Sequence, residues 1–584
     1  MRTSHSVLSS YFGPRSRRRP TQLLAIPCLA LSLGGCVGSE GPSEAEPSGA
    51  AEQDADAGQL GADPVGATML VHVEYQTEEK LNWLVSEFDV LEHADRAKGY
   101  VAMLVEPESY ERLLDEGFAV EIQHEPTEEL ASMVSGFRSI SGYACYRTVE
   151  ETATDMSTLA SDYSDLVELI DIGDSWDKVT PGGSSGYDIA GMIVTNENIA
   201  GPKPRFFLMG SIHAREYATA ELAIRFAEEM ITNYGTDPDA TWLLDNFELH
   251  VVPHANPDGR KIAEQGYTQR KNRNTSSGYC SYPPTSYSQH GVDLNRNHSF
   301  KFGGAGTSTR ACNLTYRRTS ASEPETQALE TYMSSIFADQ RGPNDNDAAP
   351  ADTTGLMITL HSYSPLVLFP WSWSAAGAPN LTELRTLGRK FGYHNGYPVC
   401  QAPVCLYAAS GSTDDWAYGT LGIAAFTFEV GTSFFQSCAS FESTIVPDNF
   451  AALREAFKAA RRPYQTPAGP DATSVAVSAS SVVAGTSVTL TADIDDTRYN
   501  SNGWGSEATQ NIAAARYTID QPSWSGATTH AMAATDGTFN ATTEGATTTI
   551  DTTGWTAGRY LLMVEGQDAN GNWGAPSAVF LDVL

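Results

Sequence analysis

Basic residues are scarce in this sequence, with 37 Lys and Arg against 71 Asp and Glu and a formal net charge of -34. Affinity for nucleic-acid phosphates comes from clustered basic side chains, so this balance argues against nucleic-acid binding. Cationic substrates are more natural partners for such a chain. The length of 584 residues suggests roughly three to five domains, at about 150 residues each.

Long apolar runs are scarce too, and the clearest one follows a basic patch near the N-terminus: PRSRRRP, then TQLLAIPCLALSLGGC. This run is too short to span a membrane comfortably and is typical of a secretion signal. Its ending, LGGC, resembles a bacterial lipobox that would leave Cys36 as a lipidated N-terminus; the alternative is a plain signal peptide. We expect residues 1–36 to be a signal peptide. The exported protein would be a lipoprotein at the bacterial cell surface or facing the periplasm, or would be released to the medium.

Cysteine is rare as well, and no Cys-x-x-Cys spacing typical of structural zinc occurs. Cys28 would leave with the signal. The remaining even number in an exported chain predicts disulfides. Cys400 and Cys405 lie near enough in sequence to close a short loop, and the sequence leaves the other pairings open. The six that remain are Cys145, Cys280, Cys312, Cys400, Cys405 and Cys438.

The first part of the mature chain changes composition twice. Residues 37–66 lack aromatic side chains and are rich in Gly, Ala, Pro, Ser and acids, which predicts a disordered linker. Residues 67–130 alternate between strand-like and helix-periodic stretches, such as TMLVHVEY and EEKLNWLVSEF. Two helices and a few strands in a short unit suit a small ferredoxin-like α+β module.

Two larger regions follow. From 140 to 465, helical stretches alternate with short apolar runs such as RFFLMG, LMITLHS and IAAFTFEV. This is typical of an α/β domain whose sheet is covered by helices on both faces. From 469 to 584, short β-runs such as SVTLTADI and ARYTID predict an immunoglobulin-like β-sandwich. The sandwich carries no catalytic constellation and its partner is not identified, so we expect an accessory or surface-binding role.

The candidate chemistry starts from His213 and Glu216, three residues apart in GSIHAREY, a spacing that chance alone can produce. A hydrolytic zinc site needs three N or O ligands and one open position for water. His361, directly after the apolar run LMITL, is the best third ligand, although a lone His after a strand is more often structural. Glu429 also ends an apolar run. Polar residues at strand ends collect along one edge of an α/β sheet, where ligand sites lie.

Seven segments occur in an order that resembles the zinc carboxypeptidases of the pancreatic A/B and bacterial T type: GSIHAREY, NPDG, QRKNRN, GVDLNRN, ITLHSYS, YAASGSTDDW and FTFEVG. The resemblance covers about residues 140–465. The module before it resembles that family's propeptide, with a processing cut expected between about residues 126 and 142. The resemblance implies a mixed sheet with helices on both faces, one Zn²⁺ per catalytic domain, and peptide or protein C-termini as substrates. We expect a monomer.

Residue roles follow from the same resemblance. His213, Glu216 and His361 would bind the zinc, and Glu429 would act as the general base. Arg270 would stabilise the oxyanion that develops during hydrolysis.

Further positions would bind or orient the substrate. Asn295 and Arg296 would hold the terminal carboxylate, because a planar guanidinium with an adjacent amide suits that anion. Tyr407 would close over the substrate. Asp293 would orient His213 through the imidazole nitrogen that does not face zinc.

The predicted site also includes a pocket for the substrate side chain and two further arginines. Asp414 and Ser372 fall at positions that line the family's side-chain pocket. An acid there resembles B-type enzymes and predicts that C-terminal Lys or Arg is accepted and preferred, although T-type relatives can combine such an acid with apolar substrates. Arg215, within the zinc motif, would face substrate. Arg273, close to Arg270, is the alternative oxyanion residue to exclude.

Two cysteine positions are similar to the family pattern, whereas two loops depart from it. Cys280 and Cys312 occupy positions similar to a family disulfide, which leaves Cys145 and Cys438 as a possible third pair. Residues 274–291 look longer than in pancreatic enzymes, and residues 337–354 look like an extended loop. Both loops would reshape the rim of the cleft.

Two other functions stay open. One is a murein carboxypeptidase that trims stem peptides, because diaminopimelate also offers an amine beside a carboxylate. The other is a catalytically inactive homologue that binds surfaces. Loss of a metal ligand or of the base would mark the latter, and no such loss occurs in this sequence.

Overall fold

The computed structural model describes residues 69–88, 90–96, 98–123, 140–182, 185–278, 280–499 and 506–584. The predicted signal peptide with Cys36, the linker, and residues 126–139 of the predicted processing stretch lie outside these ranges. Within them, no helix combines the length and apolar character that a membrane span requires.

The N-terminal module has the element order βαββαβ. Its four strands pair in the order β2-β3-β1-β4, all antiparallel, which confirms the ferredoxin-like prediction. Val71 and Val73 alternate to the buried face of β1 and pack against Leu81 and Leu84 of α1. The elements are β1 (Met69–Glu74), α1 (Glu78–Glu87), β2 (Val90–Asp95), β3 (Tyr100–Val105), α2 (Pro107–Asp115) and β4 (Val120–Ile122).

The central sheet has eight strands in the order β11-β10-β12-β9-β7-β8-β6-β5. Strands β12, β9, β7 and β8 are parallel to their neighbours in this run, whereas β10 is antiparallel to β12. The sheet is therefore mixed, as expected. The strands are β5 (Val167–Asp174), β6 (Asp188–Val194), β7 (Arg205–Met209), β8 (Glu248–Val252), β9 (Leu356–His361), β10 (Leu366–Leu368), β11 (Val399–Cys400) and β12 (Ala424–Glu429).

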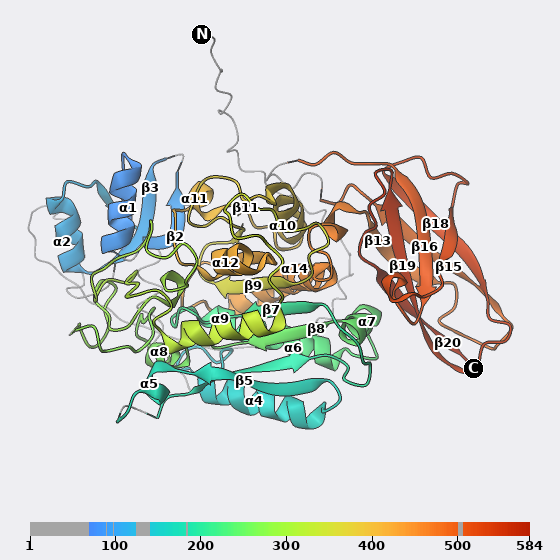
Figure 1. The fold of residues 1–584 in the computed structure, drawn as a ribbon, viewed down its shortest axis with the longest axis horizontal. Coiled ribbons are helices and arrows are strands. Elements are labelled where there is room, and N and C mark those ends of the chain that lie inside the picture. Colours follow the sequence, from blue (N-terminus) through green and yellow to red (C-terminus); the bar gives the residue numbers. More distant parts are fainter. Residues whose placement is uncertain are drawn as a thin grey trace, which may run out of the picture. The chain divides into compact units, whose positions relative to one another are not determined.

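Helices cover both faces of this sheet (Figure 1). Consecutive residues of a strand point to opposite faces. Phe206 of β7 contacts Phe457 of α14, with ring centroids 5.9 Å apart, and Phe207 contacts Tyr332 of α9 at 6.1 Å. Burial from both sides explains why every residue of β9 and β12 is buried.

The helices of this region are α4 (Val149–Asp162), α5 (Trp176–Val179), α6 (Tyr217–Thr232), α7 (Pro238–Asn246), α8 (Pro257–Ala263), α9 (Pro324–Ile336), α10 (Leu381–Asn395), α11 (Ala402–Cys405), α12 (Thr413–Trp416), α13 (Cys438–Ser440) and α14 (Val446–Ala459). Short helical segments of other types are η1 (Leu294–Arg296), η2 (Ala417–Leu421), η3 (Phe441–Ile445) and η4 (Thr466–Ala468).

The C-terminal region is an additional β domain. Its strands pair in the order β13-β15-β18-β17-β16-β19-β20-β14. Side chains of β15 alternate between exposed and buried, and Leu490 and Ile494 share an apolar core with Leu562 of β19. The elements are β13 (Asp471–Val477), β14 (Ser481–Val482), β15 (Ser487–Asp495), β16 (Ile512–Ile519), η5 (Ser523–Ser525), β17 (His530–Ala534), β18 (Thr543–Asp551), β19 (Gly558–Asp568) and β20 (Ser577–Val583).

All six predicted disulfide cysteines are paired. The pairs are Cys145–Cys438, Cys280–Cys312 and Cys400–Cys405, with Cα–Cα distances of 5.5, 5.4 and 6.2 Å. The three predicted pairings are thus confirmed.

Candidate metal centre

Three neighbouring parallel strands deliver the candidate residues to one edge of the central sheet. His361 is the last residue of β9, Glu429 is the last residue of β12, and the two are partners in the strand register. His213 follows β7, which pairs with β9 on its other side. The carboxyl ends of parallel strands share one edge, so the predicted residues meet there.

His213, Glu216 and His361 present their ligand atoms to one point. His213 Nδ1 lies 2.7 Å from Glu216 Oε1 and 3.1 Å from His361 Nδ1, and His361 Nδ1 lies 3.5 Å from Glu216 Oε2. Ligands on tetrahedral zinc, with bonds of about 2.0–2.1 Å, lie about 3.3 Å apart. At most 1% of each side chain is exposed. Two imidazoles and one carboxylate with these separations fit a zinc ion.

A tight turn brings His213 and Glu216 together. Ser211 has a positive φ of 52°, and its backbone N–H donates to Thr219 Oγ1 at 2.9 Å. The Thr219 hydroxyl in turn donates to the carbonyl oxygen of Glu216 at 2.8 Å. A Cβ at Gly210 would meet the carbonyl oxygen of Thr219 at 2.6 Å. The start of α6 therefore packs directly against the strand end, which a side chain at Gly210 would prevent.

Asp293 supports the cluster from behind. It accepts hydrogen bonds from His213 Nε2 at 3.2 Å, from Arg270 Nε at 3.1 Å and from the backbone N–H of Asn295 at 3.1 Å. Burial raises the pKa of Asp293, but the charge of Arg270 and the bond to His213 outweigh burial and hold the pKa below its ordinary value. An ionised Asp293 keeps a proton on Nε2, so that Nδ1 of His213 faces the ligand cluster.

Asn295 and Arg296 are held in fixed orientations on η1. Arg296 donates to the carbonyl oxygens of Gly306 and Asn295, at 2.9 and 2.8 Å. Asn295 Oδ1 accepts from the backbone N–H and the hydroxyl of Thr413, at 2.9 and 3.1 Å. These bonds leave the amide nitrogen of Asn295 directed away from Thr413.

Ser372 and Asp414 come from separate segments of the chain and are in contact. The Ser372 hydroxyl donates to Asp414 Oδ2 at 2.8 Å. The next residue, Asp415, accepts from the backbone N–H groups of Ser372 and Trp373 at 2.7 and 2.8 Å. Burial, followed by the charge of Asp414, raises the pKa of Asp415 well above its ordinary value. The sequence pattern assigns no role to Asp415, although the two consecutive acids in TDDW are a signal for it.

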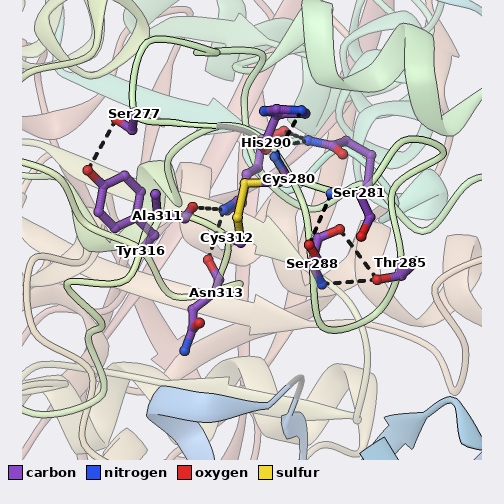
Figure 2. Close-up of a disulfide and its surroundings, with 12 residues drawn as sticks. Ser277, Cys280, Ser281, Thr285, Ser288, His290, Ala311, Cys312, Asn313 and Tyr316 are labelled. Atoms are coloured by element: carbon purple, nitrogen blue, oxygen red, sulfur yellow. Dashed lines mark hydrogen bonds between the residues drawn. A yellow bond between two sulfur atoms is a disulfide. The ribbon is translucent and has the colours of Figure 1, made fainter. Parts of the chain in front are cut away.

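Gln289 is a second residue that the sequence analysis missed. Its Oε1 accepts from the backbone N–H of Arg270 at 2.9 Å, and its own N–H donates to the carbonyl oxygen of Cys312 at 3.0 Å. Figure 2 shows the Cys280–Cys312 disulfide and hydrogen bonds that order the surrounding loop, such as the one that the Ser281 N–H donates to Ser288 Oγ at 3.1 Å. The predicted long loop at 274–291 thus supports Arg270.

The remaining predicted residues occupy distinct surroundings. Tyr407 is buried in an apolar cluster that also contains residues of the N-terminal module. Arg215 is buried with its guanidinium 3.8 Å from the ring centroid of Phe434. Arg273 forms an ion pair with Asp177 at 2.9 Å and is 35% exposed, so it is held by a different group from the one that holds Arg270.

Comparisons with known protein sequences point to one family. The profile of the zinc carboxypeptidase family matches residues 152–452. Mouse (Mus musculus) carboxypeptidase A2 is 31% identical over 298 residues, 49% of this chain and 63% of that protein. Zinc carboxypeptidase A 1 of Anopheles gambiae is 32% identical over 300 residues, 49% of this chain and 60% of that protein. The matched stretch thus spans less than two thirds of these relatives.

Solved structures agree in fold. Carboxypeptidase A from Helicoverpa armigera superposes with a TM-score of 0.54 at 20% identity, covering 69% of this chain and 98% of that chain. Thrombin-activatable fibrinolysis inhibitor superposes with a TM-score of 0.52 at 21% identity, covering 67% and 98%. Both coverages include more of this chain than the family profile matches.

Proposed function

The chain belongs to the zinc carboxypeptidase family, and from this premise we propose that it hydrolyses the C-terminal peptide bond of peptides or proteins. The observation that carries the proposal is the convergence of His213, Glu216 and His361 beside the strand that ends at Glu429. These three side chains would hold one zinc ion. Such an ion, when bound, polarises the scissile carbonyl and lowers the pKa of water.

Residues of the chain supply the proton transfer, the stabilisation of the oxyanion and the binding of the substrate. Glu429 takes the proton of the attacking water and passes it to the leaving amine. Arg270, fixed by Asp293, places a positive charge where the oxyanion develops. Arg296 and Asn295 bind the terminal carboxylate of the substrate, the guanidinium by charge and the amide by donating a hydrogen bond.

We propose further that substrates ending in Lys or Arg are preferred. Asp414 is 1% exposed, so its carboxylate has lost most of its hydration. A cationic substrate side chain in the pocket would compensate for that loss. Asp415 beside it is held by two backbone donors, and its raised pKa favours the neutral form. The pocket would therefore present one negative charge, which matches one cation. Apolar substrates would leave that charge unpaired.

The N-terminal module is proposed to block the site until it is cut away. Arg96 Nε of the module donates to the carbonyl oxygen of Leu406 at 2.9 Å, and Tyr407 packs in the same apolar cluster as the module. A substrate-closing Tyr407 cannot move while it is buried in that contact. Processing between about residues 126 and 142 would release it. Export and lipid attachment through Cys36 remain predictions of the sequence.

Zinc content tests the metal site without an activity assay. We expect one zinc per chain in the wild type, a loss of zinc in His361→Ala, and no loss in His530→Ala, a control histidine in the β domain. Equal zinc in the wild type and His361→Ala would overturn the ligand assignment.

A substrate panel separates the open functions. The processed protein is incubated with peptides that end in Lys or Leu and with murein stem peptides. Release of C-terminal Lys supports the proposal. Cleavage of stem peptides alone indicates a murein carboxypeptidase, and zinc binding without any cleavage indicates an inactive homologue.

A further inference from the structure

A cavity of about 530 Å³ lies where the end of α14 and the segment after it meet the β domain. None of its lining residues is a candidate metal ligand. Its basic side chains are Lys458, Arg461, Arg462 and Arg516, and its one acidic side chain is Glu565. The excess of positive charge is unexpected in a chain whose net charge is -34.

Two of the four basic groups already have carboxylate partners. Lys458 pairs with Asp239 at 2.5 Å, and Arg516 pairs with Glu565 at 2.7 Å. Among the described residues, Arg461 and Arg462 form no ion pair; Arg462 donates to the amide oxygen of Gln465 at 3.1 Å. The cavity therefore has two guanidinium groups whose charge is left for a ligand.

The excess positive charge has a cost in the free protein, which the charge of Glu565 offsets only in part at Arg461. Burial, and then the neighbouring charge of Arg462, lower the pKa of Arg461 to about 10. Two like charges that are partly desolvated favour any anion that enters the cavity. A carboxylate or sulfate between them would form charge-assisted hydrogen bonds.

Two indoles form part of the cavity wall, and a guanidinium group lies over each of them. Trp524 and Trp573 both line it, with the Arg461 guanidinium 4.7 Å from the ring centroid of Trp524 and that of Arg516 3.6 Å from Trp573. Gln465 lines the same cavity. A sugar ring offers one apolar face to an indole and hydroxyls to polar groups, which suits this combination.

The space continues beyond this cavity. A second cavity, of about 930 Å³, shares Arg461 and Trp524 with the first. We propose that this surface of the C-terminal region binds an anionic oligosaccharide, with its carboxylate or sulfate groups on Arg461 and Arg462. An acidic peptide would satisfy the guanidinium groups but would not use the indole walls.

Titration calorimetry with the full chain tests the proposal. The probes are a tetramer of galacturonic acid, a sulfated tetrasaccharide, neutral maltotetraose and tetraglutamate. We expect one or both anionic sugars to bind, and their difference identifies carboxylate or sulfate as the preferred group. The double variant Arg461→Gln/Arg462→Gln should weaken that binding by at least about tenfold.

Controls separate binding from folding. Arg385→Gln removes an exposed arginine from α10, outside both cavities, and should leave the affinity unchanged. Zinc content should be the same in every variant. The proposal is overturned if neither anionic sugar binds, if maltotetraose or tetraglutamate binds as tightly, or if the double variant binds like the wild type.

Discussion

Buried carboxylates near the candidate metal centre differ in how their charge is compensated. Asp293 has an arginine, an imidazole and a backbone N–H around it. Among the described residues, Asp414 accepts one side-chain hydrogen bond, from Ser372. A buried carboxylate with a single hydroxyl donor is costly unless a cation arrives. This contrast is the physical basis for assigning Asp414 to substrate and Asp293 to support.

Replacing Asp414 by Ala should change specificity more than activity. For a peptide that ends in Lys, kcat/KM should fall by about 30-fold or more, because truncating one partner of a buried charge pair costs about 2–5 kcal/mol. For a peptide that ends in Leu, kcat/KM should stay equal or rise. Asp536→Ala, an exposed acid in the β domain, is the control. A parallel loss on both peptides would contradict the pocket assignment.

Glu325 is another buried carboxyl group, and it is not among the predicted site residues. The amide of Asn272 donates to both Glu325 and Glu323, at 3.0 and 2.9 Å. Burial, with a smaller contribution from the charge of Glu323, raises the pKa of Glu325 to about 8. Its value in an unfolded chain is near 4.5. Between these two pKa values the folded protein holds a proton that the unfolded chain has lost.

Stability should therefore decline as pH rises from about 4.5 to about 8, by up to about 1.4 kcal/mol per pH unit from this group. Glu325→Gln should flatten the decline. The unfolding free energy of the variant, relative to that of the wild type, should therefore be higher at pH 8 than at pH 5. Denaturant unfolding at both pH values measures this. Glu383→Gln, also in the first turn of a helix, should leave the decline unchanged; an equal slope in Glu325→Gln would refute the assignment.

At the scale of elements, the parallel strands explain why part of the site was predictable. His361 and Glu429 end apolar runs, and topology brings such ends to one edge. Gln289 had no comparable signal, because its contact with Arg270 spans 19 residues of loop. Loop conformation depends on long-range contacts that leave no periodic pattern in the sequence. The fold classes followed from periodicity, whereas the disulfide partner of Cys280 needed a family resemblance.

The Cys280–Cys312 loop should stabilise the protein and position Arg270. The bond closes a sequence separation of 32 residues, and a loop of that length is worth about 3–4 kcal/mol in the chain-entropy estimate. The double variant Cys280→Ser/Cys312→Ser should lose that much unfolding free energy. Loosening Gln289 should also lower kcat at unchanged zinc content.

Equilibrium unfolding and single-peptide kinetics check both effects. Cys400→Ser/Cys405→Ser, which opens a loop of separation 5, should cost less stability. An unchanged unfolding free energy in the first double variant would show that the loop is held by its other contacts.

For the whole molecule, β19 connects two apolar cores. Leu562 packs in the β-domain core, whereas its neighbours Leu561 and Met563 pack in the core of the α/β region. A buried ion pair reinforces the junction: Lys390 of α10, which is 1% exposed, donates to Asp471 of β13 at 2.8 Å. The β domain and the α/β region are therefore joined by apolar contacts and by a buried ion pair.

Asp471→Ala should destabilise the whole chain, not the β domain alone. Removing one partner of a buried pair costs about 3–5 kcal/mol, so the unfolding free energy should fall by that amount. Zinc release should coincide with loss of β structure on heating. Asp582→Ala, which breaks the exposed pair with Arg559, should cost less than about 1 kcal/mol. Zinc release well separated from unfolding of the β domain would contradict the shared core.

The central claim is that Glu429 and the three metal ligands form one hydrolytic site. The most direct measurement is the release of C-terminal Lys from a peptide by the processed protein, in the wild type and in Glu429→Gln, with zinc measured on both. We predict equal zinc and a rate that falls by at least about 100-fold, the scale of general-base catalysis. Equal rates at equal zinc content would contradict the account.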